Sequence, residues 1–137
     1  MTAIDYVDQA IEQSRARARA AGAQVDFLLA DVTRLTEVDL GVGFDLVPDN
    51  KCFHGLPTAS RGAYAKGVAS ACHPGATYLL FALTPGRFRR VLGLPRGIDP
   101  IEVTSVFAPY FETISHRPAR RGPFEPAFYE MRRERTY

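Results

Sequence analysis

The sequence has no run of about eighteen or more apolar residues, which excludes a membrane-spanning helix. It has no N-terminal basic region followed by an apolar stretch, so it shows no signal peptide and we expect a cytoplasmic protein. It has only two cysteines, Cys52 and Cys72, and they lack the spacing of a metal site. We therefore expect free thiols and no bound metal.

Lysine is scarce, because Lys51 and Lys66 are the only two and arginine supplies the other basic charges. Residues 1–86 carry a net charge of −2 and residues 87–137 carry +4. A net charge of +2 is too small for the basic footprint of a nucleic-acid-binding protein, so we expect no nucleic-acid partner. A group of arginines in a Pro/Gly-rich loop remains a candidate contact for an anionic substrate, beside the simpler interpretation of a solvated surface: Arg87, Arg89 and Arg90.

The composition is that of a soluble globular protein, with 46% hydrophobic and 23% charged residues. A length of 137 residues suits a single domain that spans the whole chain. The order of its segments then decides the fold class.

Acidic residues follow three short apolar segments in the first fifty residues. We predict strands over residues 1–4, 25–30 and 44–47. Asp5 follows the first of them, Asp31 the second and Asp49 the third. The second and third are mostly apolar, which predicts strands buried on both faces. Ligands of open parallel sheets bind beyond the carboxyl ends of the strands, so these carboxylates suggest a nucleoside-type ligand.

The remaining segments complete an α/β pattern. Helical spacing predicts helices over about 8–21, 58–73 and 100–108, with a buried strand over 76–83. The segment from Pro48 to Pro57 reads as irregular. Alternation of apolar and polar residues over 111–117 and 127–133 predicts an antiparallel pair at the edge of a mostly parallel sheet.

This order and four segments resemble the class I S-adenosylmethionine-dependent methyltransferases, most closely their small-molecule branch: AIDYVDQAIEQSRARA, FLLADVTRL, FDLVPDNKCFHGL and HPGATYLLFAL. No single segment is a strong motif, but their order and spacing together are fairly specific. The resemblance implies a Rossmann-like three-layer sandwich with an antiparallel edge strand. It implies an enzyme that transfers a methyl group from S-adenosylmethionine to a small molecule and leaves S-adenosylhomocysteine as product.

The resemblance also implies where the adenosine part of this cofactor binds. Asp5 matches the acid that accepts hydrogen bonds from both ribose hydroxyls, and Tyr6 would lie beside the adenine. Asp31 matches the acid that accepts from the adenine amine, while the Val32 N–H meets a ring nitrogen.

The methyl-donor end is implied to lie near the next loop. Asp49 and Asn50 match the loop beside the methionine moiety, and His54 with Phe53 would face the substrate. His54 is the histidine whose position suits a catalytic base, which is needed only when the acceptor carries a proton.

Simpler interpretations of these residues stay open. Asp5, Asp31 and Asp49 could cap turns or helices, since aspartate favours both roles. His54 could be an ordinary loop histidine. Cys52 has no evident base partner, so we do not expect a nucleophile there.

One part of the family pattern has no match in this sequence, namely the first strand with its glycine-rich turn, which would precede Asp5. The family strand order places that strand between the strands of Asp5 and Phe44, where a gap would leave main-chain groups without partners. Three solutions are open: a start codon further upstream, a homo-oligomer formed through the incomplete sheet, or direct pairing of the two flanking strands.

Two other functions also remain. One is a non-catalytic methyltransferase remnant that oligomerises or binds a partner through its open sheet. The other is a dinucleotide oxidoreductase, which the absence of a G-x-G-x-x-G turn disfavours.

Overall fold

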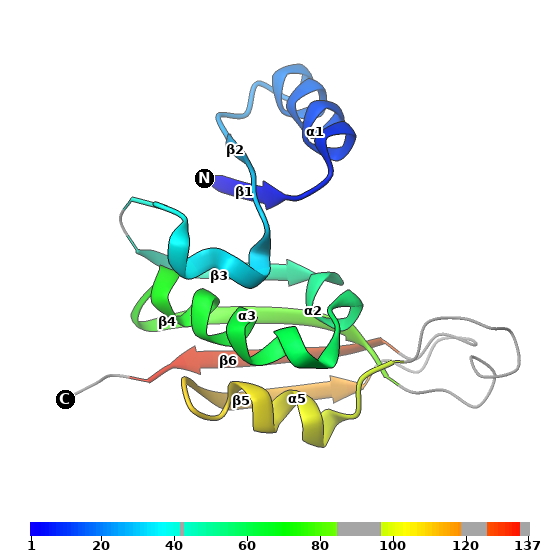
Figure 1. Ribbon diagram of the computed structural model, residues 1–137, viewed down its shortest axis with the longest axis vertical. Coiled ribbons are helices and arrows are strands. Elements are labelled where there is room, and N and C mark those ends of the chain that lie inside the picture. The colour runs from blue at the N-terminus through cyan, green and yellow to red at the C-terminus, as the bar shows by residue number, and fades with distance from the viewer. Residues whose placement is uncertain (42, 85–96, 119–125, 135–137) are drawn as a thin grey trace, which may run out of the picture.

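The computed structural model describes residues 1–41, 43–84, 97–118 and 126–134 (Figure 1). Its elements, in chain order, are β1 (Thr2–Asp5), α1 (Asp8–Ala20), β2 (Asp26–Leu29), the 3-10 helix η1 (Val32–Glu37), β3 (Phe44–Asn50), α2 (Cys52–Gly55), α3 (Thr58–Ala71), β4 (Cys72–Leu83), α5 (Pro100–Phe107), β5 (Phe111–Pro118) and β6 (Pro126–Arg133). Within these ranges no helix is both long enough and apolar enough to cross a membrane.

The strands form two separate sheets. β1 pairs in parallel with β2, and a second sheet has the order β3-β4-β6-β5. β3 and β4 are parallel, whereas β6 runs antiparallel to both of its neighbours, β4 and β5. The predicted antiparallel pair at the sheet edge is therefore confirmed, with β5 as the outermost strand.

The strands on either side of the expected gap do not pair with each other. In the described part of the chain, β1 hydrogen-bonds only to β2 and β3 only to β4. The hypothesis that the strands of Asp5 and Phe44 pair directly is therefore wrong. Figure 1 shows the β1–β2 pair standing apart from the larger sheet, with β1 and β3 pointing the same way.

One face of the larger sheet carries the core. Strand alternation directs Tyr78 of β4 toward the helices, where it lies 5.0 Å from the Phe107 ring of α5. Phe53 of α2 packs 4.9 Å from the same Phe107 ring and 5.9 Å from Tyr64 of α3. Because Phe53, Tyr78 and Phe107 are each 0% exposed, this aromatic cluster holds α2, α3 and α5 on one face.

The opposite face of the larger sheet is open. Alternate residues on β3, β4 and β6 remain exposed there, with Leu46 at 55%, Leu79 at 40% and Phe128 at 49%. Leu29 of β2 is likewise 57% exposed. The prediction that the second and third strands are buried on both faces is therefore wrong, because among the described residues a covering layer lies on one side only.

The segment predicted as irregular is mostly regular. β3 continues through Pro48 to Asn50, and the short helix α2 follows. Proline is tolerated there because β3 is an edge strand, where a missing N–H removes no ladder bond on the open side.

The strand after α3 begins earlier than predicted. β4 starts at Cys72, and the register jumps from Phe44↔Cys72 to Leu46↔Thr77. Gly75, with φ of 86°, lies inside this bulge. Pro74 and Gly75, between the helix predicted over 58–73 and the strand predicted over 76–83, therefore belong to the distorted beginning of β4 and do not form a turn that ends the helix.

A glycine of α3 lets the 3-10 helix approach closely. A Cβ at Gly67 would lie 2.7 Å from the Cβ of Leu35 in η1, whereas a Cβ at Gly62 would meet nothing within 4 Å. Leu35 is only 7% exposed. Gly67 is thus required by packing, while Gly62 only lowers the helix propensity of α3.

These two glycines give a matched pair of substitutions. We expect Gly62→Ala to raise the free energy of unfolding by about 0.5–1 kcal/mol, because alanine costs less backbone entropy in a helix. We expect Gly67→Ala to lower it by about 1–3 kcal/mol, because the methyl group overpacks against Leu35. Urea unfolding followed by circular dichroism measures both; equal effects of the two variants would contradict this packing.

Candidate functional site at the strand ends

Polar residues gather where three strands end. Asp5 is the last residue of β1, and it lies in register with Leu29, the last residue of β2. Asp31 follows two residues beyond that strand, and Asn50 ends β3. These side chains therefore leave the two sheets at their carboxyl ends, where ligands of open α/β sheets bind.

The first two acids each make local hydrogen bonds through one oxygen. Asp5 Oδ1 accepts from the Val7 N–H at 2.9 Å. Asp31 Oδ1 accepts from the Thr33 N–H at 2.8 Å and from the Thr33 hydroxyl at 2.7 Å, which lowers the pKa of the Asp31 carboxyl. The capping interpretation of both residues therefore has support.

Capping leaves part of each carboxylate available. Within the described ranges, no hydrogen bond reaches Oδ2 of Asp5 or of Asp31. A carboxylate has lone pairs for about four hydrogen bonds. The caps therefore orient both side chains while leaving acceptor capacity for a ligand.

The residues next to these acids differ in exposure. The Tyr6 side chain is 76% exposed, and Val32 is buried at 9% exposure. Val32 is the first residue of η1, so its N–H is one of the donors that the helix itself does not use.

Asp49 is held inside the protein. It is 5% exposed, and its carboxylate accepts from the N–H groups of Cys52 and Phe53 at 2.7 and 3.0 Å. Its Oδ2 also accepts from the hydroxyls of Tyr64 at 2.8 Å and Tyr78 at 3.0 Å. The side chain thus caps α2 and ties β3, α3 and β4 together.

The two tyrosines of this network were not predicted from the sequence. Burial, then the charge of Asp49, raises the pKa of the Tyr64 hydroxyl well above its usual value. Burial, followed by the neighbouring Tyr64 hydroxyl, raises the pKa of the Tyr78 hydroxyl as well. Both phenols therefore stay protonated and donate. A tyrosine within an apolar strand such as β4 was the available signal, because a buried hydroxyl needs a partner.

The Asp49 network fixes the shape of the following loop. Lys51 adopts the left-handed region with φ of 71°, and its N–H donates to the Phe81 carbonyl at 3.0 Å. The Lys51 Nζ lies 5.5 Å from the centre of the Phe81 ring. Asn50, just before this turn, has an exposed side chain at the strand end.

Phe53 and His54 do not face the same environment. Phe53 is fully buried in the aromatic cluster, so the prediction that it faces a substrate together with His54 is wrong. Consecutive residues of a helix point about 100° apart, and α2 directs Phe53 inward. His54 is half-buried on the same short helix.

The Cys52 thiol belongs to the first residue of α2, shortly after the end of β3. Burial is the main cause that raises the pKa of this thiol to about 12, followed by the negative charges of Asp49, Asp5 and Asp31. Each of these negative charges disfavours the thiolate. The neutral thiol is not a nucleophile at physiological pH, and such a negative region favours a cationic ligand.

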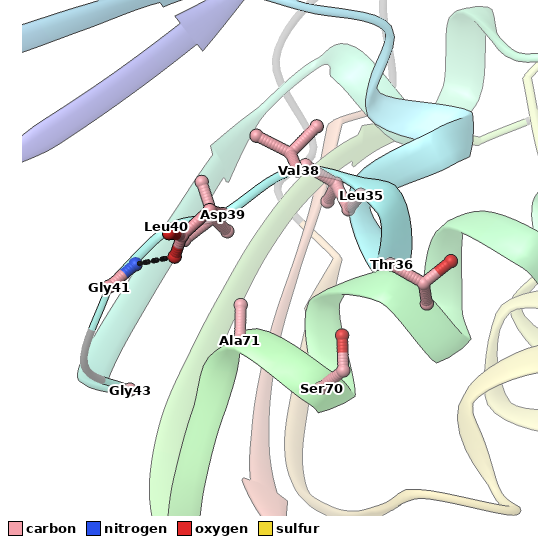
Figure 2. A pocket seen from close by; sticks show the side chains of 9 residues that line it. All are labelled: Leu35, Thr36, Val38, Asp39, Leu40, Gly41, Gly43, Ser70 and Ala71. Atoms are coloured by element: carbon pink, nitrogen blue, oxygen red, sulfur yellow. Dashed lines mark hydrogen bonds between the residues drawn. The ribbon is translucent and has the colours of Figure 1, made fainter.

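A surface pocket lies elsewhere. It has a volume of about 260 Å³, and Figure 2 shows it between the end of α3 and η1 with the chain that follows η1. It is lined by Leu35, Thr36, Val38, Asp39, Leu40, Gly41, Gly43, Ser70 and Ala71. Gly43 directly precedes β3, so the pocket lies at the amino end of that strand. The hydrogen bond drawn in Figure 2 runs from the Gly41 N–H to the Asp39 carboxylate, at 2.9 Å. None of the predicted site residues lines it.

The arginine cluster proposed for an anionic substrate, Arg87, Arg89 and Arg90, lies outside the described residues. In those that are described, no group of three or more His, Cys, Asp or Glu could hold a metal ion.

Solved structures show the same fold. A protein from a study of the conversion of a disulfide bond into a thioacetal group during echinomycin biosynthesis aligns with a TM-score of 0.82 at 21% identity, over 97% of this chain and 66% of that protein. The N-methyltransferase NodS from Bradyrhizobium japonicum WM9, in complex with S-adenosylhomocysteine, aligns with a TM-score of 0.77 at 13% identity, over 96% and 65%. The 1,6-didemethyltoxoflavin-N1-methyltransferase of Burkholderia thailandensis aligns with a TM-score of 0.75 at 18% identity, over 98% of this chain and 61% of that protein.

These similarities establish the fold. The chain has the α/β fold of the S-adenosylmethionine-dependent methyltransferases and spans about two thirds of the length of those proteins. No protein-family model and no curated protein sequence matches it.

The Asp49 network predicts a graded loss of stability. We expect Tyr64→Phe to lower the free energy of unfolding by about 1–3 kcal/mol, because one hydrogen bond to a carboxylate is lost. Asp49→Ala should cost at least about 3 kcal/mol, because three buried donors and one partly buried donor lose their acceptor. Tyr110→Phe serves as control, since no hydrogen bond of its hydroxyl occurs in the described chain. Denaturant unfolding checks the order, and a Tyr64→Phe variant as stable as the control would contradict it.

The raised pKa of Cys52 predicts that its thiol is alkylated slowly. In a Cys72→Ala variant, we expect iodoacetamide to alkylate Cys52 at pH 8 at least about 100-fold more slowly than an ordinary cysteine, because the thiolate is scarce. Below the raised pKa, the rate should increase about tenfold per pH unit. Mass spectrometry measures the rate, and the urea-unfolded chain is the control. Equal rates in the folded and unfolded chain would show that the thiol is not desolvated.

Proposed function

We propose that this protein binds S-adenosylmethionine and transfers its methyl group to a small molecule. The observation that carries this proposal is the placement of Asp5, Asp31 and Asp49 at or just beyond the carboxyl ends of β1, β2 and β3, in a chain with the methyltransferase fold. The methyl donor is a sulfonium cation, and such a negative region attracts it.

The adenosine part fits the two acids of the smaller sheet. The Oδ2 atom of Asp5 has no described partner and can accept hydrogen bonds from ribose hydroxyls. The corresponding oxygen of Asp31 can accept from the adenine amine, while the Val32 N–H donates to a ring nitrogen. The exposed ring of Tyr6 supplies a surface for the adenine face.

The methyl-donor end fits the loop after β3. Asn50 presents an exposed amide at the strand end, and Asp49 acts by fixing the turn that carries it. The methyl group moves from sulfur to the acceptor in an in-line displacement, in which sulfur keeps the electrons of the broken bond. Such a step depends mainly on the positioning of the two reactants.

His54 is the proposed base for acceptors that lose a proton. It follows Phe53 on α2, whose start is capped by Asp49, so the position of its backbone is fixed. Two of the three structures compared above are methyltransferases in complex with S-adenosylhomocysteine, and one of these holds 1,6-didemethyltoxoflavin as well. These examples support a small-molecule acceptor here.

A second candidate is a remnant of the same fold without catalysis. The open edges of β1 and β3 favour it, because an exposed strand edge pairs readily with another chain and would give an oligomer. It predicts stable self-association without cofactor binding.

Calorimetric titration with S-adenosylhomocysteine distinguishes these candidates. We expect the 137-residue chain to bind it, and Asp5→Ala or Asp31→Ala to weaken binding at least about tenfold by removing a hydrogen-bond acceptor from the ligand. Asp8→Ala is the matched control, because Asp8 is an exposed acid three residues along the chain. NAD is the control ligand and should give no heat.

Three outcomes would count against the proposal. A folded chain that binds no S-adenosylhomocysteine but self-associates supports the non-catalytic remnant. Equal weakening by Asp5→Ala and Asp8→Ala would show that only overall charge matters. Binding of NAD in preference would favour the oxidoreductase.

A further inference from the structure

Lys51 occupies a backbone conformation that a lysine rarely adopts. Its φ is 71°, and within the described ranges it is the one residue other than glycine with a positive φ. Glycine adopts this conformation without steric cost, whereas a Cβ crowds the neighbouring carbonyl oxygen. Such residues are uncommon, and they are found most often at functional sites, where the surrounding structure holds them in place. The lysine side chain at this turn is therefore a candidate for a role of its own.

The surrounding contacts fix this lysine beside the strand ends. Lys51 lies between Asn50, the last residue of β3, and the first residue of α2. Its N–H donates to the Phe81 carbonyl of β4 at 3.0 Å, and the Asp49 carboxylate caps the helix that follows. The main chain is thus held on both sides of Lys51, so its side chain starts from a fixed point next to the proposed methyl-donor end.

The ammonium group of Lys51 has no acidic partner. The side chain is exposed, and no ion pair of Lys51 occurs in the described part of the chain. Its Nζ lies 5.5 Å from the centre of the Phe81 ring. This contact is weak at an exposed site, and the flexible four-carbon stem can leave it while the turn stays in place.

Other basic residues in the helices of this region are already paired. Arg34 of η1 forms an ion pair with Glu37, and Arg61 of α3 forms one with Glu102 of α5. Lys51 therefore offers an unpaired positive charge directly after the end of β3, among the residues that the structure describes.

The methyl donor carries a group that the acids of the site do not suit. Besides its sulfonium and its amine, S-adenosylmethionine has a carboxylate on its methionine part. Asp5, Asp31 and Asp49 are anionic acceptors, so they repel a carboxylate and offer it no donor. An ammonium group attracts a carboxylate and donates hydrogen bonds to it. A lysine next to Asn50 supplies this missing partner.

We propose that Lys51 binds the carboxylate on the methionine part of the donor and thereby makes the site selective for ligands that carry this group. This inference rests on the proposed function, because it assigns a further residue within the same cofactor site. A carboxylate of the methyl acceptor is the other anion that could meet this ammonium group, so the test uses no acceptor.

Calorimetric titration with two ligands tests the assignment. One ligand is S-adenosylhomocysteine, and the other is its decarboxylated analogue, S-adenosyl-3-thiopropylamine, which lacks only the carboxylate. We expect Lys51→Gln to weaken binding of S-adenosylhomocysteine at least about tenfold, because the carboxylate loses a charged hydrogen-bond donor. Binding of the decarboxylated analogue should stay unchanged, since it has no group that pairs with the lysine.

Three further variants separate charge from loop structure. Lys51→Arg should keep the affinity for S-adenosylhomocysteine within about threefold, because a guanidinium group also pairs with a carboxylate. Lys51→Gly removes the ammonium group and adopts the positive φ without strain, so it should give the same selective loss as Lys51→Gln. Lys66→Gln is the matched control: it changes the only other lysine, which is exposed on α3, and should alter neither affinity.

The outcomes distinguish this assignment from the proposed function. An unsubstituted, folded chain that binds neither ligand contradicts the proposed function, and the assignment with it. Binding of both ligands, with equal weakening by Lys51→Gln, would show that the lysine acts through the shape of the turn, which overturns the assignment alone. Unchanged binding of S-adenosylhomocysteine to the Lys51→Gln and Lys51→Gly variants also overturns it and leaves an acceptor carboxylate as the anion for this lysine.

Discussion

The four hydrogen bonds to the buried Asp49 carboxylate are the interaction on which the arrangement of the larger sheet and its helices depends. They join the end of β3 to the start of α2 through two N–H groups and to α3 and β4 through two tyrosine hydroxyls. The left-handed turn at Lys51 and the buried ring of Phe53 follow from this arrangement. Asn50 and His54 therefore leave the strand end from a fixed loop, as a binding site requires.

The candidate site spans two sheets that do not pair. Asp5 and Asp31 belong to the smaller sheet, and Asn50 belongs to the larger one. The described contacts that hold the halves together are the packing of η1 against α3, which Gly67 permits, and the packing of Ile4 against the main core. A ligand that contacts both parts of this candidate site would bind with an affinity that depends on how firmly the two sheets are held.

The sequence predicted the elements well because their signals are local. The helices and strands follow from the apolar periodicity of the sequence. Burial on both faces was predicted wrongly for the second and third strands, because the apolar residues of a short strand such as 44–47 do not reveal whether both covering layers exist. The Asp49 network was not predicted either, because the tyrosines that bond to it are distant in sequence.

The most direct test of the account is a titration of the isotope-labelled chain with S-adenosylhomocysteine, followed by nuclear magnetic resonance of the backbone amides. We expect the shifts to concentrate at the ends of β1, β2 and β3, with the amides of Tyr6, Val32 and Asn50 among those affected. Shifts confined to the pocket beside Leu40 and Ser70, or no shifts in a folded chain, would contradict a cofactor site at the strand ends.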